Sequence, residues 1–249
     1  LYGRTIPLSA SKIDRFAGCR YAFFLQYGLR AAPWKQAEFD APLFGSFVHD
    51  VLEYVVRAAQ ENGGFAAMTD GEISALTERC MDACMGTYLP QGEAAASRER
   101  YLSARNRQEA AAVVMDVARE LRLSQFAPAA EELRFAPGGP LPPIEYRAKS
   151  GSGLLTGQID RVDIYEADGT RYFRIIDYKT GHKDFDYAEL LYGKNLQMLL
   201  YLFALEGEGE RYFGHPVVPA GVLYTPARDV ILRTERGATE EKIRAALDK

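Results

Sequence analysis

The stretch GQIDRVDIYEADGTRYFRIIDYKTG, residues 157–181, carries β-branched and aromatic residues on both sides of Asp168-Gly169. Asp-Gly between two strand-like runs is a strong signal for a hairpin with a two-residue turn. With these two residues at the turn, Asp160 lies opposite Asp177. A bulge or a one-residue slip would separate the two carboxylates, so the prediction depends on this register.

The same register predicts the surroundings of the two aspartates. Their face of the hairpin is otherwise apolar and carries Val162, Ile164, Phe173 and Ile175. On the other face, Asp163 should meet Arg174 as a pair of opposite charge. Directly opposed side chains have Cβ atoms about 4.5 to 5.5 Å apart, where like charges destabilise a sheet. Two carboxylates at an apolar face should therefore raise their pKa values or recruit a cation, and a divalent metal ion would remove the conflict.

Lys179 is two residues beyond Asp177 and therefore lies on the same face of the strand. An ammonium group there can neutralise charge on a phosphate oxygen and help to orient or deprotonate an attacking water, while a metal ion polarises the phosphoryl group. These residue types together predict a site for phosphodiester hydrolysis. The alternative is a salt-bridge cluster on a solvated sheet face, and the apolar neighbours argue against it.

The hydrophobic spacing changes from helical in the first half of the chain to alternating in the second. We expect helices over 9–29, 43–61, 70–88 and 98–126, strands near 144–149, 154–166, 171–180 and 217–225, and helices over 187–205 and from 239. Ser9 or Ser11 should cap the first helix, and Asn62-Gly63-Gly64 should end the second. The prediction is an α/β fold with a central mixed sheet flanked by helices. It forms one domain, with a helical region over 1–128 and a catalytic sheet core over 129–249.

Composition excludes several other classes of protein. A chain of 249 residues can bury a substantial core. No run approaches the roughly 18 apolar residues of a membrane span, and the start lacks a secretory signal, so we expect a cytoplasmic protein that does not enter membranes. The odd count of three cysteines favours reduced thiols. No Gly-rich loop ends in Gly-Lys-Ser/Thr, so nothing suggests an ATPase.

The charge is uneven along the chain. A net charge of −4 argues against a protein that coats nucleic acid through bulk positive charge. In residues 1–35, however, Asp14 stands against six basic residues, which are Arg4, Lys12, Arg15, Arg20, Arg30 and Lys35. Aromatic residues between them, such as Tyr21 and Tyr27, could stack bases while the basic residues hold a phosphate backbone. An amphipathic helix with a solvated basic face fits the same pattern equally well.

Several motifs occur in an order that resembles a known family. They are Leu8-Ser9-Ala10-Ser11, Cys19-Arg20-Tyr21-Ala22-Phe23, Gly45-Ser46-Phe47-Val48-His49, Gly157-x-x-Asp160-Arg161, Asp177-Tyr178-Lys179-Thr180-Gly181 and Asn195-Leu196-Gln197-Met198-Leu199-Leu200-Tyr201. Each is weak alone, but in this order they resemble the RecB-type branch of the PD-(D/E)xK nucleases. Within that branch the chain looks most like the AddB-type nuclease domains of bacterial helicase–nucleases.

The resemblance implies a role for each residue of the site. It makes His49, Asp160, Asp177 and the backbone carbonyl of Tyr178 ligands of Mg²⁺ or Mn²⁺, Lys179 the catalytic lysine, and Gln197 with Tyr201 a helix pair near the substrate phosphate. It also implies a deoxyribonuclease, exonuclease action on a single-stranded DNA end or strand, and an AddA-type helicase partner in double-strand break repair. A Cas4-like or stand-alone exonuclease is the alternative within the fold. A DNA-binding module with a decayed nuclease centre is the alternative of another class.

Local patterns support parts of this assignment. Gln197 and Tyr201 share one face of a leucine-rich helix, and a buried glutamine needs a partner. Gly45, one turn before His49, should leave room beside the imidazole. A lone helical histidine is nevertheless more often a surface or core residue than a ligand, and Gln197 could cap a strand carbonyl. Tyr192 and Lys194 could touch DNA or lie on a solvated face.

AddB-type domains also hold an iron–sulfur cluster, with one cysteine before the nuclease core and three beyond it. Cys19 matches the first of these cysteines, and the sequence has none after Cys84. We therefore expect no cluster in this chain, and a cluster only in a longer native chain. Cys80 and Cys84, four residues apart on an expected helix, are more typical of packed thiols than of cluster ligands.

Overall fold

A computed structural model describes residues 3–32, 41–88, 97–149, 151–181, 185–228 and 237–247. In chain order the elements are β1 (Thr5–Leu8), α1 (Ala10–Gly18), α2 (Arg20–Phe23), the π-helical turn η1 (Phe24–Gly28), α3 (Ala41–Glu61), the 3₁₀ turn η2 (Phe65–Ala67), α4 (Asp70–Tyr88), α5 (Ser97–Leu123), β2 (Ala127–Phe135), β3 (Ile144–Ala148), β4 (Gly151–Leu155), β5 (Gly157–Ala167), β6 (Thr170–Lys179), α6 (Tyr187–Leu191), α7 (Gln197–Phe213), β7 (Val217–Pro226) and α8 (Glu240–Leu247). The predicted α/β class is confirmed. None of the helices in these ranges is long and apolar enough to cross a lipid bilayer.

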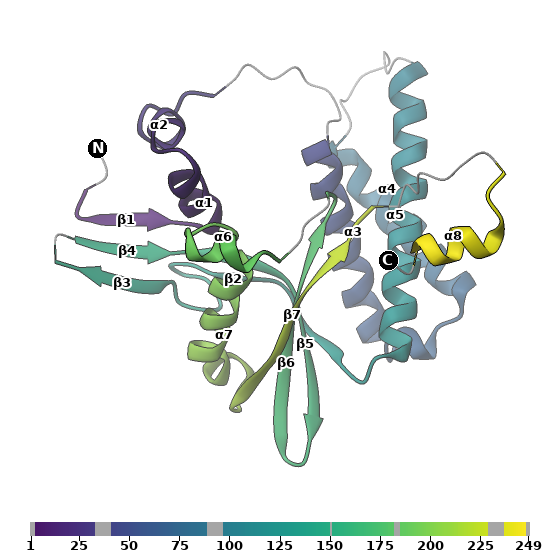
Figure 1. Cartoon of the computed structure of the whole chain (residues 1–249). Helices are drawn as coiled ribbons and strands as arrows, with labels where there is room; N and C mark the ends of the chain where they lie inside the picture. The colour runs from purple at the N-terminus through teal and green to yellow at the C-terminus, as the bar shows by residue number, and fades with distance from the viewer. Residues whose placement is uncertain are drawn as a thin grey trace.

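Two sheets organise the chain (Figure 1). The four-stranded sheet has the order β2-β5-β6-β7, and it is mixed because β6 pairs with β7 in parallel while its other pairs are antiparallel. The smaller sheet has the order β1-β4-β3. Helices α3, α4 and α5 lie on one side of the four-stranded sheet, and α7 lies on the other. The central sheet is therefore enclosed by helices, as the sequence predicts.

The hairpin of β5 and β6 has the predicted turn and register. Asp168 and Gly169 have φ values of 51° and 74°, the left-handed conformation that a type I′ turn requires of both central residues. The cross-strand pairs run from Ala167 with Thr170 back to Arg161 with Ile176. One more step along this register places Asp160 opposite Asp177.

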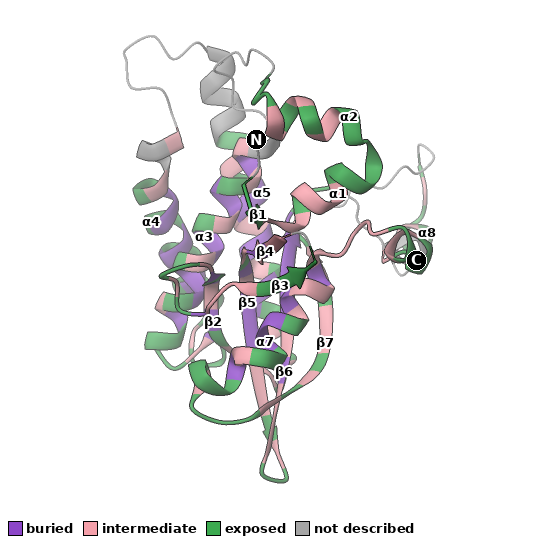
Figure 2. Ribbon diagram, turned by 90° about the vertical axis from the view of Figure 1, so that its left-hand side faces the viewer, coloured by how far each residue is buried: buried purple, intermediate pink, exposed green. Residues whose placement is uncertain are grey.

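Two hydrophobic clusters hold the layers together. In α3 the residues repeat at three- and four-residue spacing, and Phe47, Val48, Val51, Leu52, Val55 and Val56 are all buried. They pack with α4, α5, Ile176 and Tyr178. A second cluster joins Val162, Phe173 and Ile175 to residues of α7. Figure 2 shows buried residues along α3 and the central strands. The apolar face predicted beside the aspartates is covered by α7, and α3 packs on the opposite face.

Three element predictions are wrong in their boundaries. The helix expected over 9–29 breaks at Cys19, which is extended with φ −160° and ψ 108°. The strand expected over 154–166 is two strands, because Thr156 binds the carbonyl of Leu8 and separates β4, in the small sheet, from β5. The helix expected over 187–205 is interrupted by positive φ values at Gly193 and Asn195. Strands β1 and β2 were not predicted.

Candidate metal centre

The residues predicted for the site meet although they come from both sides of the sheet. Asp160 lies on β5, Asp177 and Lys179 on β6, His49 on α3, and Gln197 with Tyr201 on α7. An open pocket of about 450 Å³ is lined by His49, Asp160, Asp177, Tyr178, Lys179, Thr180, Gly181 and Gln197. Helices α3 and α7 and the β5–β6 hairpin therefore bring their functional side chains to one concave surface.

Asp160 is held by the backbone of the opposite strand. Its Oδ2 accepts a hydrogen bond of 2.7 Å from the backbone N–H of Tyr178 and lies 3.6 Å from Nδ1 of His49. Burial raises the pKa of Asp160 above its usual range, and the nearby charge of Asp177 adds to this shift while His49 opposes it. This is the electrostatic conflict expected of two opposed carboxylates.

His49 supplies positive charge to the acidic pocket. Its Nε2 lies 3.1 Å from the carbonyl oxygen of Tyr178, and its Nδ1 lies 3.7 Å from Oε1 of Glu132. Burial alone would lower the pKa of the imidazole, but Glu132, Asp160 and the Tyr178 carbonyl together raise it to about 9. A protonated imidazole thus balances the carboxylates, and a metal ion bound by His49 would have to displace its proton.

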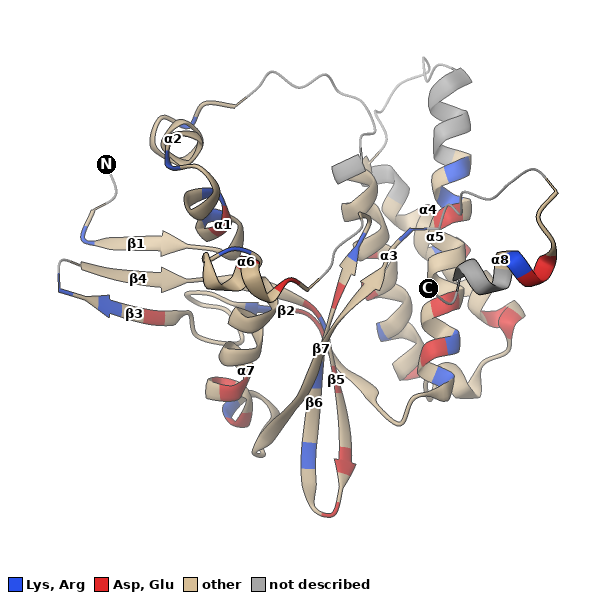
Figure 3. Cartoon of the chain, in the orientation of Figure 1, with Lys and Arg blue, Asp and Glu red and all other residues tan. Residues whose placement is uncertain are grey.

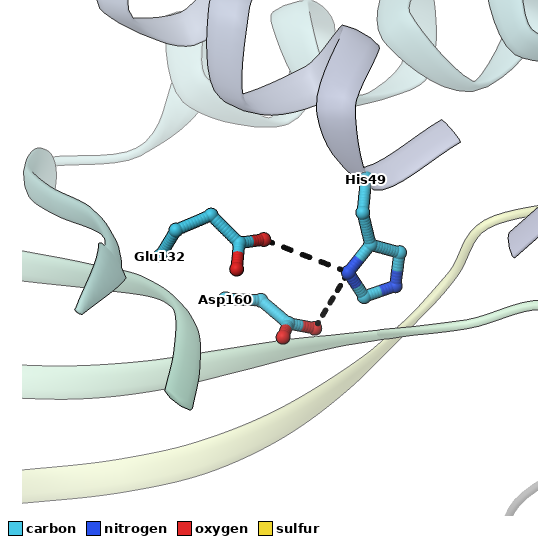
Figure 4. A group of neighbouring side chains, drawn as sticks. All are labelled: His49, Glu132 and Asp160. Atoms are coloured by element: carbon cyan, nitrogen blue, oxygen red, sulfur yellow. Dashed lines mark ion pairs between the residues drawn. The ribbon is translucent and has the colours of Figure 1, made fainter. Parts of the chain in front are cut away.

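Glu132 is a site residue that the sequence did not reveal. It lies on β2 between the pairs that join Glu131 to Arg161 and Leu133 to Ile159, and this register brings it to Asp160. Figure 4 shows the side chains of Glu132 and Asp160 converging on His49. The amide of Gln158 donates a hydrogen bond to the Glu132 carboxylate. One ligand atom from each of His49, Glu132 and Asp160 lies within 4.8 Å of the others, so the three could hold a metal ion.

Lys179 and Gln197 form the other end of the site. Nζ of Lys179 lies 2.5 Å from Oδ2 of Asp177 and donates a hydrogen bond of 3.3 Å to Oε1 of Gln197. The amide nitrogen of Gln197 donates to Oδ1 of Asp177 at 2.7 Å and to the hydroxyl of Tyr201 at 3.1 Å. Gln197 is half-buried, and the partners that its side chain finds are Asp177, Lys179 and Tyr201 of the site. Burial raises the pKa of Tyr201 to about 12, so its hydroxyl stays protonated.

Other predicted residues lie outside the pocket. A Cβ atom at Gly45 would contact the side chain of Thr180 at 3.6 Å, so the space there faces Thr180 and not the imidazole as predicted. Tyr192 is exposed. Cys19 is an exposed free thiol, whereas Cys80 is buried and Cys84 half-buried in the helical cluster, as expected of packed thiols.

Of the basic residues near the N-terminus, Lys12 and Arg15 lie on α1 and Arg20 on α2, whereas Arg4 precedes β1 and Arg30 follows η1 (Figure 3). Lys12 binds the carbonyl of Pro7, and Arg15 donates to Gln26, so both are engaged within this segment. Tyr21 is exposed, and Lys35 lies outside the described residues. These contacts fit the amphipathic-helix interpretation, and they leave the prediction of a DNA-binding surface untested.

Gly157 gives the first testable prediction. A Cβ atom there would lie 2.4 Å from the Phe135 ring and 2.9 Å from the Tyr201 ring, closer than packed atoms allow. We expect Gly157→Ala to lower the free energy of unfolding by about 1–3 kcal/mol, the usual range for overpacking, and to displace Tyr201. Urea unfolding followed by circular dichroism measures this. Gly207→Ala is the control, because open space surrounds that helical glycine and alanine favours helix. Equal stability of the two variants would contradict the packing argument.

Comparisons with known proteins point in the same direction as the geometry. The family model of the PD-(D/E)XK nuclease superfamily matches residues 7–248. The chain is 36% identical over 251 residues to a protein of Acetivibrio thermocellus that is named as a subunit of the ATP-dependent helicase/deoxyribonuclease, and the match covers 100% of this chain and 22% of that protein. The corresponding proteins of Caldanaerobacter subterraneus and Geobacillus thermodenitrificans are 33% and 31% identical, over 98% and 97% of this chain and 21% of each relative. The chain therefore spans about a fifth of the length of these relatives.

Proposed function

Because the chain belongs to the PD-(D/E)XK nuclease superfamily, we propose that it hydrolyses phosphodiester bonds of DNA with the help of Mg²⁺ or Mn²⁺. The observation that carries the proposal is the meeting of Asp160, Asp177 and Lys179 with His49 in one pocket. A decayed nuclease centre would not keep these four groups, which contact one another directly or through Tyr178 and Gln197.

The donor set fits a divalent ion. His49, Glu132 and Asp160 already bring ligand atoms within 4.8 Å of one another, and Asp177 and the carbonyl of Tyr178 would complete the set. The helical region 1–128 and the sheet core 129–249 would then act as one domain. Carboxylate and carbonyl oxygens suit Mg²⁺, and an imidazole beside them suits Mn²⁺ at least as well. When bound, such an ion polarises the phosphoryl group and lowers the pKa of a bound water.

The remaining polar residues orient the reacting groups. The ammonium of Lys179 is fixed between Asp177 and Gln197, where it can neutralise charge on a phosphate oxygen as that charge develops. Gln197 uses its amide nitrogen on Asp177 and its oxygen on Lys179, so it sets the distance between the carboxylate and the cation. Tyr201 accepts from the same amide nitrogen, and its protonated hydroxyl can donate to a phosphate oxygen.

The relatives suggest a wider setting for this reaction. Their names describe a subunit of an ATP-dependent helicase/deoxyribonuclease. We propose that this chain acts as the nuclease domain of such a subunit in the cytoplasm, and that an AddA-type helicase partner delivers single-stranded DNA ends to it during double-strand break repair. A native gene that encodes no further domain would favour the Cas4-like or stand-alone exonuclease instead.

An assay with purified protein tests the activity. End-labelled linear single-stranded DNA and, separately, circular single-stranded DNA are incubated with Mn²⁺, with Mg²⁺ or with EDTA. We expect the linear DNA to be shortened from an end with either metal, the circular DNA to remain intact, and EDTA to prevent all cleavage. Cleavage of the circular DNA would show that the protein acts as an endonuclease and not as an exonuclease. Absence of both cleavage and Mn²⁺ binding, measured calorimetrically, would contradict the proposal.

Metal binding should depend on pH. His49 has a pKa of about 9 without metal, so it is protonated below that pH and must lose its proton to act as a ligand. We expect the apparent affinity for Mn²⁺ to rise roughly tenfold per pH unit up to about pH 9 and then to level off, because one proton is released per ion. Below neutral pH the dependence should steepen, because burial also raises the pKa of Asp160.

Calorimetric titrations between about pH 6 and pH 10 measure this dependence. The variant His49→Gln keeps a polar side chain that cannot titrate, so its affinity should be weaker and the tenfold slope above neutral pH should disappear. An unchanged slope in this variant would show that His49 does not exchange its proton for the ion.

A further inference from the structure

A network of buried charges lies behind the site. Arg161 is 1% exposed and Asp163 is 0% exposed. Their side chains pair at 2.8 Å, measured from Nε of Arg161 to Oδ1 of Asp163. Arg174 from the neighbouring strand approaches the other oxygen of Asp163 at 2.8 Å. Glu120 of α5 accepts from both arginines. Isolated buried charges are costly, and here each charge has a partner from another element or strand.

Arg161 also contacts a residue of the site. Its Nη1 donates a hydrogen bond of 2.8 Å to the hydroxyl of Tyr178. Arg161 follows Asp160 directly, and Tyr178 stands between Asp177 and Lys179. Because side chains alternate along a strand, Arg161 and Tyr178 point to the face opposite the two aspartates. The far face of the hairpin is therefore linked to the site through the backbone of Tyr178.

The backbone of Tyr178 contacts two of the proposed metal ligands. Its N–H donates to Asp160 at 2.7 Å, and its carbonyl oxygen lies 3.1 Å from Nε2 of His49. Movement of this residue would therefore shift the Asp160 carboxylate and the His49 imidazole together. Its ring is buried in the helical cluster, and Arg161 fixes its hydroxyl.

We propose that the side chains of Arg161 and Tyr178 have a positioning role, through which the buried network fixes the geometry of the metal ligands, including the Tyr178 carbonyl; this inference rests on the proposed function. Arg161 takes its position from Asp163 and Glu120, and it holds the Tyr178 side chain in one place. The backbone of Tyr178 then orients Asp160 and His49. Groups that orient metal ligands commonly change metal affinity 10- to 100-fold when they are removed.

The variant Tyr178→Phe tests this role, because it keeps the buried ring and removes the hydroxyl that binds Arg161. We expect the dissociation constant for Mn²⁺, measured by calorimetry, to rise about tenfold or more. Hydrogen exchange of the residue 178 amide should speed up by a similar factor, because its bond to Asp160 loosens. Arg161→Lys should change both quantities in the same direction, since a single ammonium cannot replace the guanidinium fork.

Arg174→Gln is the matched control. Arg174 belongs to the same network and contacts Asp163 and Glu120. Its polar contacts within the described residues do not include Tyr178, so this variant should lower thermal stability and leave Mn²⁺ affinity and the residue 178 exchange rate within twofold of the parent. A Tyr178→Phe variant that binds Mn²⁺ like the parent would overturn the inference and leave the proposed function intact. Equal losses of affinity in Tyr178→Phe and Arg174→Gln would also overturn it, because the network would then support only the fold. A parent protein that binds no Mn²⁺ would overturn the proposed function itself.

Discussion

Replacing Lys179 with alanine is expected to reduce metal-dependent cleavage of single-stranded DNA on the order of 10³-fold while the protein stays folded and still binds Mn²⁺. Loss of one group that stabilises transition-state charge typically costs a factor of 10²–10³, and Lys179 also positions Asp177 and Gln197. Gln197 still donates to Asp177, and the Tyr178 N–H and His49 still contact Asp160, so metal affinity should change little. Steady-state cleavage of end-labelled DNA and calorimetry measure the two effects separately.

Two further variants make this result specific. Asp177→Asn keeps the shape of the side chain and removes its charge, so it should abolish cleavage together with tight Mn²⁺ binding. Lys242→Ala is the control for loss of a positive charge, because Lys242 is exposed on α8, and it should cleave at the parent rate. A Lys179→Ala variant with more than a tenth of the parent activity would refute the assignment of the catalytic lysine.

The central part of this site could be predicted because its geometry is local. The turn at Asp168-Gly169 sets the register of β5 and β6, and alternation then places Lys179 on the face of the two aspartates. The stripe in α3 identified the helix that carries His49, although only the resemblance to the nuclease family connected that helix to the sheet. The spacing of Gln197 and Tyr201 predicted that they share one face of a helix. Their contacts with each other and those of Gln197 with Asp177 and Lys179 are seen only in the structure.

Glu132 could not be found in this way, because its position depends on an irregular strand. β2 begins with Ala127-Pro128-Ala129-Ala130, a stretch of weak strand propensity, and its register shifts between Pro128 and Ala130. Glu132 itself has a φ of 49°, a conformation that is uncommon for residues other than glycine. A prediction from residue patterns assumes regular alternation of side chains. For this reason neither strand β2 nor the direction of the Glu132 carboxylate could be predicted.

The buried network was predicted only in part. The hairpin register predicted the pairing of Asp163 with Arg174, but it did not predict how deeply the two side chains are buried. Arg161 became buried because α5 covers this face of the sheet and brings Glu120 to it, across 41 positions of sequence. Such packing between distant elements is decided by the tertiary fold, and no local pattern in the hairpin specifies it.

Asp163→Ala is expected to lower the free energy of unfolding by about 3–5 kcal/mol, the range measured when one partner of a buried ion pair is removed. The variant leaves Arg161, 1% exposed, and Arg174, with its side chain 14% exposed, without the carboxylate that lies between them. Glu120, whose side chain is 42% exposed, would remain as a shared partner for both guanidinium groups. Domains are commonly stable by only about 5–15 kcal/mol, so this loss would bring the protein close to unfolding.

Urea unfolding at neutral pH, followed by circular dichroism, measures this effect. The control is Asp116→Ala, because Asp116 pairs with Arg119 on the surface and its side chain is 70% exposed; exposed pairs of this kind contribute less than about 1 kcal/mol. Cleavage by Asp163→Ala should fall as the folded fraction falls with rising temperature, and the folded molecules should also bind Mn²⁺ more weakly, because Arg161 loses a partner that positions it. Lys179→Ala, in contrast, should be inactive while fully folded. A loss below about 1 kcal/mol in Asp163→Ala would mean that water or a shift of α5 compensates both arginines, and the buried charges would then not hold the hairpin in place.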